Sequence, residues 1–128
     1  MSGPSVESTT RRSRVVGRLR ALDLRANHLS ARGAWALARS PYLGDLRVLD
    51  LSANEIDDEG ALLLARSPAF SELVELRLGG CRLTEAGAMA LANSPNLGRL
   101  RALTLGGNPI AEDARRALEA VTRARVQW

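Results

Sequence analysis

The side chains that could carry out chemistry are few in this sequence of 128 residues. His28 is the single histidine and Cys81 the single cysteine. A catalytic nucleophile and its base must lie within hydrogen-bond reach of each other. The repeat described below separates these two residues by almost two stacked strands, or about 10 Å at about 4.8 Å per strand. We therefore predict that His28 is a solvated loop residue and that Cys81 is a buried structural thiol.

Two further patterns resemble parts of catalytic or binding sites. Asp57-Asp58-Glu59 is a run of three acids, but it opens a predicted helix, where the helix macrodipole favours negative charge. The pairs Gly79-Gly80 and Gly106-Gly107 lack the lysine and helix that follow a phosphate-binding loop. One cysteine forms no internal disulfide, and no Cys/His cluster suggests a metal site. We predict no catalytic residue, no cofactor and no metal, and thus no enzyme.

Composition and charge narrow the class of protein. Apolar residues make up 45% of the chain and aromatic residues only 3%, so the core of this single domain must be aliphatic. No apolar stretch reaches the roughly 18 residues of a membrane span, and no secretory signal is visible. We therefore expect a cytoplasmic protein that binds no membrane.

The net charge of +4 is unevenly distributed along the chain. Every basic residue is an arginine, and residues 1–20 combine five arginines with the single acid Glu7. The other 108 residues contain 13 arginines and 13 acids, which cancel. We therefore expect a basic leader joined to an electrically balanced domain that has no basic stripe. The five arginines, which lie in the leader and the approach to the first strand, are Arg11, Arg12, Arg14, Arg18 and Arg20.

A period of 27 residues organises the chain and sets the elements that position these side chains. Each unit reads L-x-x-L-x-L-x-x-[N/C]-x-[L/I], followed by a G-A-x-x-L-A run and a Ser-Pro pair, and no insertion is needed to align the units. The L-x-L segment alternates with period two, which predicts a strand with one buried face. The equivalent positions include Leu22, Leu49, Leu76 and Leu103; Leu24, Leu51, Leu78 and Leu105; and Asn27, Asn54, Cys81 and Asn108.

These motifs resemble the leucine-rich repeat family, specifically its ribonuclease-inhibitor-like class, and the G-A-x-x-L-A runs at 33–38, 60–65 and 87–92 resemble the bacterial GALA-type subclass. The resemblance covers residues 19 to about 120. It implies an α/β fold: a right-handed solenoid forming a short horseshoe arc, with parallel strands on the concave face and helices on the convex face. It implies no reaction.

The sequence also predicts where each helix begins and ends. Ser30, Asp57 and Thr84 each precede the repeat glycine by three residues and are good N-cap residues. The Ser-Pro pairs at 40–41, 67–68 and 94–95 end the helices. On a helical wheel, Trp35, Leu62 and Met89 lie on one flank of successive helices, so we expect them to pack against the glycine of the next helix. An exposed apolar stripe on the convex face is the alternative.

The domain boundaries follow from the same register. We expect residues 1–12 to be a disordered basic leader and 13–128 to be a single repeat domain. Within it, a degenerate half-repeat spans 13–18, the repeats start near 19, 46, 73 and 100, and a capping helix covers about 111–127. The chain could also be a piece of a longer repeat protein.

The family resemblance places the non-core strand positions on the concave face, in three rows. We predict that the partner-binding residues are Asp23, Arg25, Val48, Asp50, Ser52, Glu75, Arg77 and Thr104. None of these rows contains an aromatic residue, and hot spots of tight interfaces favour Trp, Tyr and Arg. We therefore expect these residues to form at most a modest polar interface. The rows are Ala21, Val48, Glu75 and Ala102; Asp23, Asp50, Arg77 and Thr104; and Arg25, Ser52, Gly79 and Gly106.

The resulting hypothesis is a non-enzymatic, monomeric module that binds an unidentified protein through its concave face and takes no small-molecule substrate. Two alternatives remain open: binding of nucleic acid or another polyanion through the arginine-rich tail, and a purely structural role in a larger solenoid. Nucleic-acid binding by the repeats themselves is disfavoured, because they offer no stacking aromatics.

Overall fold

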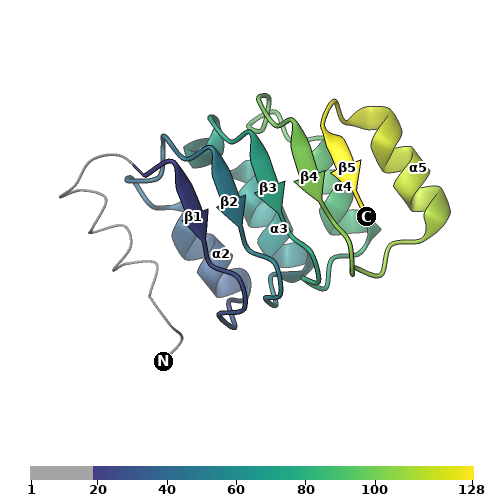
Figure 1. The fold of residues 1–128 in the computed structure, drawn as a ribbon, viewed down its shortest axis with the longest axis horizontal. Coiled ribbons are helices and arrows are strands. Elements are labelled where there is room, and N and C mark those ends of the chain that lie inside the picture. The colour runs from purple at the N-terminus through teal and green to yellow at the C-terminus, as the bar shows by residue number, and fades with distance from the viewer. Residues whose placement is uncertain (1–18) are drawn as a thin grey trace.

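The computed structural model describes residues 19–128 and shows strands and helices alternating along the chain (Figure 1). The predictions for residues 1–18, the disordered leader and the degenerate half-repeat, lie outside the described residues, as does most of the arginine-rich tail. The elements are β1 (Ala21–Asp23), α2 (Ala31–Ala38), β2 (Val48–Asp50), α3 (Asp57–Arg66), the 3-10 helix η1 (Pro68–Phe70), β3 (Glu75–Arg77), α4 (Glu85–Ala92), β4 (Ala102–Thr104), α5 (Glu112–Val121) and β5 (Arg125–Gln127).

The strands form one parallel sheet in the order β1-β2-β3-β4-β5. From β1 to β4 each residue pairs with the one 27 positions further on, so Leu22, Leu49, Leu76 and Leu103 stand side by side. These leucines are buried, as are the leucines two residues beyond each of them. The sequence period is therefore the strand register, and the aliphatic core lies behind the sheet.

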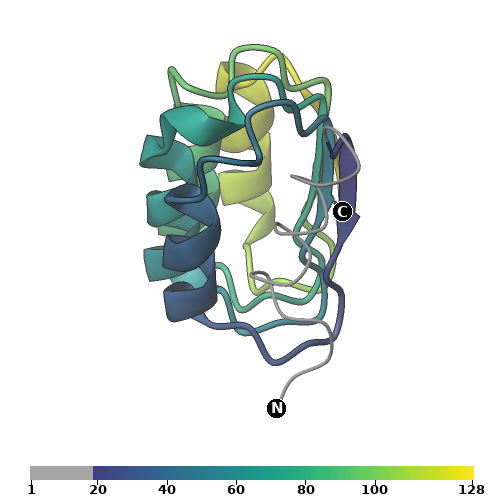
Figure 2. The same ribbon diagram turned by 90° about the vertical axis from the view of Figure 1, so that its left-hand side faces the viewer.

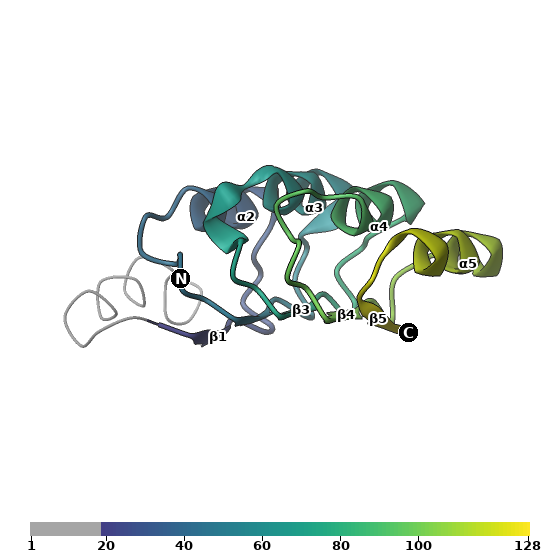
Figure 3. The same cartoon turned by 90° about the horizontal axis from the view of Figure 1, so that it is seen from above.

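The helices form a second layer on one side of the sheet, with the core between the two layers (Figure 2). Each helix packs on the next, from α2 to α5. Seen from above, the helices lie on the outer, convex side and the strands on the inner side of a shallow arc (Figure 3). A helix is wider than a strand, about 10 Å against about 4.8 Å, so a stack of such units curves toward its strands. None of the helices in residues 19–128 is long and apolar enough to span a membrane.

A buried asparagine closes the loop after β2 and again after β4. The buried Asn54 amide nitrogen donates to the carbonyl oxygens of Leu24 and Leu51 at 2.9 and 2.8 Å. Its oxygen accepts from the backbone N–H groups of Asn27 and Leu29, both at 2.9 Å. Asn108, two units further along the chain, makes the equivalent four bonds. These amides pair backbone groups that would otherwise be buried without partners, which is costly.

The helix starts follow the predicted positions to within one residue, since α3 begins at Asp57 itself with Ile56 as its N-cap. The capping chemistry differs from one repeat to the next. Ser30 Oγ accepts from the backbone N–H of Arg32, and Asp57 Oδ1 accepts from those of Glu59 and Gly60. Thr84 makes no side-chain cap bond of its own. Instead, Asp58 of the preceding helix accepts from the Thr84 N–H at 2.8 Å and from the Gly87 N–H at 3.0 Å. The Asp58 carboxylate therefore lies in the first turn of α3 and caps the start of α4.

The predicted packing of the helix flank is wrong for two of its three residues. The side chains of Trp35 and Leu62 are 49% and 37% exposed, whereas Met89 is half-buried against the core. A Cβ on Gly60 would lie 3.3 Å from the Ala31 Cα and 3.4 Å from the Ala34 Cβ, so these alanines pack there instead of Trp35. The helices approach so closely that only small residues fit between them, and the large side chains turn outward.

The carboxyl-terminal end also differs from the prediction. The helix expected over 111–127 ends at Val121, and residues 125–127 form a fifth strand. Arg125 N donates to the Arg101 carbonyl oxygen at 2.8 Å, and Leu105 N donates to that of Gln127 at 2.7 Å. The edge of β4 offers unpaired backbone groups along its whole length, and pairing with β5 satisfies more of them than another helical turn would.

Candidate protein-interaction surface

The three predicted rows lie side by side on the face of the sheet away from the helices. The strand register aligns Ala21, Val48, Glu75 and Ala102, and likewise Asp23, Asp50, Arg77 and Thr104. Backbone hydrogen bonds continue this register past the strands, as from Leu24 N to the Asp50 carbonyl oxygen and from Ala26 N to that of Ser52. The row from Arg25 to Gly106 therefore continues the same surface, here called the concave face. The structure brings all eight predicted partner-binding residues onto it.

Charged side chains on the first strands form a connected network. The carboxylate of Asp23 holds Arg25 from two sides, with Oδ1 accepting from the Arg25 Nε at 3.0 Å and Oδ2 lying 3.0 Å from the Arg25 Nη2. The Arg25 Nε also lies 3.5 Å from Asp50 Oδ2. Since Asp50 is only 6% exposed, this carboxylate is the buried centre of the network.

Arg77 extends the network to the third strand. Its Nη1 lies 3.8 Å from Asp50 Oδ2, and its Nε donates to Glu75 Oε2. The chain of contacts therefore runs from Asp23 through Arg25, Asp50 and Arg77 to Glu75, with three acids and two arginines alternating. Asp23 and Asp50 are directly opposite each other on β1 and β2, where two like charges repel. Arg25 offsets this repulsion because it contacts both carboxylates.

Hydrogen bonds within the network shift two of its ionisation equilibria. The pKa of Asp23 is lowered, first by its hydrogen bond from the Arg25 backbone N–H and then by that from the guanidinium group. The pKa of Arg25 is raised, chiefly by the same carboxylate. Both side chains are exposed, so these shifts mark a fixed geometry more than a large stabilisation.

The rest of the concave face is small and neutral. Ser52 Oγ accepts from the Gly79 N–H at 3.1 Å, and Thr104 Oγ1 lies 3.3 Å from Gln127 Oε1. β5 adds Arg125 and Gln127 to the rows, which the sequence analysis missed by extending the helix. The alternation of Ala124 and Val126 with polar residues is the signal that could have revealed this strand.

The potential reactive residues lie apart from the concave network. Cys81 is buried, and its thiol donates to the Leu51 carbonyl oxygen at 3.0 Å. Burial raises its pKa, which leaves little of the reactive thiolate. His28 is exposed in a loop. Across residues 19–128, no three His, Cys, Asp or Glu side chains gather closely enough to hold a metal ion.

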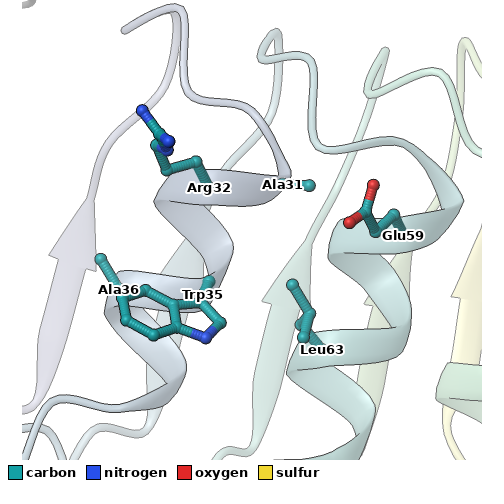
Figure 4. A pocket seen from close by; sticks show the side chains of 6 residues that line it. All are labelled: Ala31, Arg32, Trp35, Ala36, Glu59 and Leu63. Carbon is teal, nitrogen blue, oxygen red and sulfur yellow. The ribbon is translucent and has the colours of Figure 1, made fainter.

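Two of the hollows in residues 19–128, both outside the concave face, bear on the predictions. One, of about 680 Å³, lies on the helical side between α2 and α3, where Trp35, Leu63 and Glu59 surround it (Figure 4). The Arg39 guanidinium lies over the Trp35 ring, 4.7 Å from its centroid. The other, of about 620 Å³, lies where the strands begin, and four arginines contribute to its lining. The repeats, for which no basic stripe was expected, therefore gather positive charge at this second hollow.

Comparison with known proteins agrees with this geometry. A Leucine Rich repeat family model matches residues 19–38, 45–65 and 72–92. A solved structure described as "Leiomodin-1 Actin-Binding Site 2 (ABS2)" superposes with a TM-score of 0.71 at 15% identity, covering 93% of this chain and 73% of that one. No curated protein sequence matches this chain significantly. The fold is thus a leucine-rich-repeat solenoid, with parallel strands on its concave face and helices on its convex face.

Proposed function

We propose that this leucine-rich-repeat solenoid is a protein-interaction module that binds its partner through the concave face. The observation that carries the proposal is the five-residue network from Asp23 to Glu75. It holds charged groups at fixed positions over three adjacent strands. Surface charges that are already held in place lose less side-chain entropy when a partner arrives.

The chemistry of this face defines the kind of complex it can form. It offers carboxylates and guanidinium groups beside small neutral residues, and it has no aromatic side chain on β1 to β4. Charge complementarity of this sort contributes mainly to association rate and specificity. We therefore propose a partner with mixed charge, bound with moderate affinity that weakens as salt concentration rises.

The comparisons support a protein partner in general terms. Solenoids of stacked repeats present extended concave surfaces, which repeat proteins use for binding. The similar solved structure is described as an actin-binding site, but at 15% identity the likeness concerns the fold. We accordingly propose the class of partner, a protein, and not actin itself.

Quantitative affinity capture tests the proposal. Wild-type protein and the triple variant Asp23→Asn, Asp50→Asn, Arg77→Gln are immobilised at equal density, and retained proteins are measured by mass spectrometry. The two Asp→Asn changes keep side-chain size, whereas Arg77→Gln shortens the side chain. Together the substitutions remove two negative charges and one positive charge. We expect the specific partner to be depleted at least about tenfold, because several charge-assisted contacts are lost together.

A matched control separates the concave face from net charge. Glu59→Gln, Glu112→Gln, Arg116→Gln makes the same charge change on exposed helical residues. Equal capture by wild type and the concave variant would contradict the proposal, as would equal depletion by both variants. Circular dichroism of each variant shows whether its fold is retained.

A further inference from the structure

The edge of the sheet where the strands begin carries a second arrangement of charge that the proposed function does not use. This edge lies uppermost in Figure 1, because all the strands run the same way. Arg47 N donates to the Arg20 carbonyl oxygen, and Arg101 N donates to that of Val74. These ladder bonds fix Arg20, Arg47, Val74 and Arg101 as one row across the edge, immediately before β1 to β4.

A hollow of about 620 Å³ opens at this edge. Two of its arginines, Arg47 and Arg101, belong to the row just described, and Arg99 and Arg123 come from the loops that precede β4 and β5. Val74, Gly98 and Leu100 supply an uncharged part of the lining. The hollow therefore combines guanidinium groups with some apolar surface.

The positive charge of the hollow is largely uncompensated. Glu72 is the one acid among its lining residues, and its Oε1 lies 3.2 Å from the Arg99 Nη1. Arg47, Arg101 and Arg123 make no ion pair with any residue in 19–128. Four arginines and one glutamate leave a net charge of +3 around one open cavity. Since residues 21–128 balance overall, this edge concentrates positive charge that is compensated elsewhere on the domain.

We propose that this arginine edge is a binding site for an acidic peptide segment, which is a function separate from that of the concave face. Carboxylates fit the planar fork of a guanidinium group with two parallel hydrogen bonds. Arg47 and Arg101 stand two strands apart, or about 10 Å, so an extended peptide can reach both of them. The apolar lining accommodates the methylene groups of glutamate side chains.

The lining distinguishes an acidic peptide from a nucleic acid. Single-stranded nucleic acids are held by aromatic side chains that stack on the bases as well as by positive charge. None of the residues that line this hollow is aromatic. Arginines with an aliphatic surround fit a chain of carboxylates better than a chain of bases.

Fluorescence anisotropy with defined probes tests this site. The probes are a fluorescein-labelled nonapeptide of alternating Glu and Ser, the same peptide with Gln for each Glu, and a labelled oligonucleotide of twelve thymidines. We expect the acidic peptide to bind and the Gln peptide not to bind. The Arg47→Gln, Arg101→Gln variant should weaken acidic-peptide binding at least about tenfold, because two charge-assisted pairs are lost.

The control variant Arg32→Gln, Arg66→Gln removes the same charge from helices α2 and α3 and should leave binding unchanged. Equal weakening by both variants would overturn the proposal, and so would absence of acidic-peptide binding to wild type. Tighter binding of the oligonucleotide than of the acidic peptide would likewise overturn it. The concave triple variant should bind the acidic peptide normally, so a failure here is distinct from a failure of the concave face.

Discussion

At the scale of single residues, Cys81 shows how a side chain is used for structure in place of reactivity. It occupies the slot that Asn54 and Asn108 fill in the neighbouring units. Its thiol donates to the Leu51 carbonyl oxygen, as the Asn54 amide donates to that of Leu24. A thiol has no strong acceptor comparable to the amide oxygen. Cys81 therefore makes the hydrogen bond that the asparagine NH₂ group would donate, but its sulfur accepts hydrogen bonds only weakly.

Burial of Cys81 predicts slow thiol chemistry and a pH-dependent contribution to stability. Its pKa is raised in the folded chain by desolvation, so the unfolded state loses its thiol proton first as pH rises. The associated stabilisation is complete below about pH 8.5, the unfolded pKa. It is lost as pH rises toward the folded pKa. We expect thiol-specific reagents to react slowly at pH 8 with native protein and rapidly in denaturant.

The stability effect is measured by denaturant unfolding of wild type and Cys81→Ala at pH 7.5 and pH 10. The difference in unfolding free energy between the two proteins should shrink at the higher pH, because other titrating groups contribute equally to both. A difference that grows with pH, or a native thiol that reacts as fast as the unfolded one, would contradict this assignment.

At the scale of elements, each loop after a strand passes through a left-handed backbone conformation at one repeated position. The first two units have Ala26 and Ala53 there, with φ of 54° and 59°, and the later units have Gly80 and Gly107, with φ of 60° and 76°. A left-handed φ strains any residue that has a Cβ. At this position the repeats therefore share a backbone conformation that only Gly80 and Gly107 adopt without strain.

Exchanging these residues should move stability in opposite directions. Gly80→Ala introduces a Cβ that meets no atom within 4 Å, so its cost is conformational, about 1 kcal/mol. Ala53→Gly relieves the strain but enlarges the entropy of the unfolded chain, which leaves a gain of up to about 0.5 kcal/mol. Urea unfolding of both single variants measures the two changes. Stabilisation by Gly80→Ala would show that the left-handed path is not retained.

At the scale of the whole molecule, stacking makes every unit depend on its neighbours. β5 and the carboxyl-terminal residue cover the last repeat, since the Trp128 main chain lies against Gly106 and the Trp128 Nε1 donates to Glu119 at 3.1 Å. The Arg115 guanidinium lies 4.9 Å from the centroid of the Trp128 ring. A strand and an aromatic side chain together therefore cover the fourth repeat unit.

Removal of this covering should destabilise the whole domain. A variant that ends at Val121 loses β5 and leaves the edge of β4 without backbone partners. We expect a loss of about 2 kcal/mol and a Tm lower by roughly 8 °C for a domain of this size, together with self-association through the open edge. Calorimetry and light scattering measure both effects. The full-length variant Arg125→Ser, Gln127→Ser keeps the backbone pairing, so a comparable loss of Tm there would contradict this explanation.

Most of the architecture was predictable because the same repeated residues determine both the secondary structure of each unit and its packing on the next unit. The 27-residue spacing of leucines predicted the strands and their register, both confirmed for β1 to β4. The concave rows themselves came from the family resemblance. The Ser-Pro pairs correctly predicted that the helices end before residues 41, 68 and 95. Periodicity works here because each unit makes the same contacts with the next.

The mispredicted features depend on distances between elements that periodicity does not contain. Trp35 and Leu62 have the right spacing to pack between helices, but the close approach at Gly60 and Gly87 leaves room only for small groups. β5 forms because β4 offers it an open edge. The arginine edge joins residues from the four loops that precede β2 to β5. Its net positive charge does not appear in a count along the chain, because residues 21–128 balance overall. Residue spacing thus specified the repeat unit and its stacking direction, whereas helix separation, edge pairing and charge clustering arise only when the units meet in space.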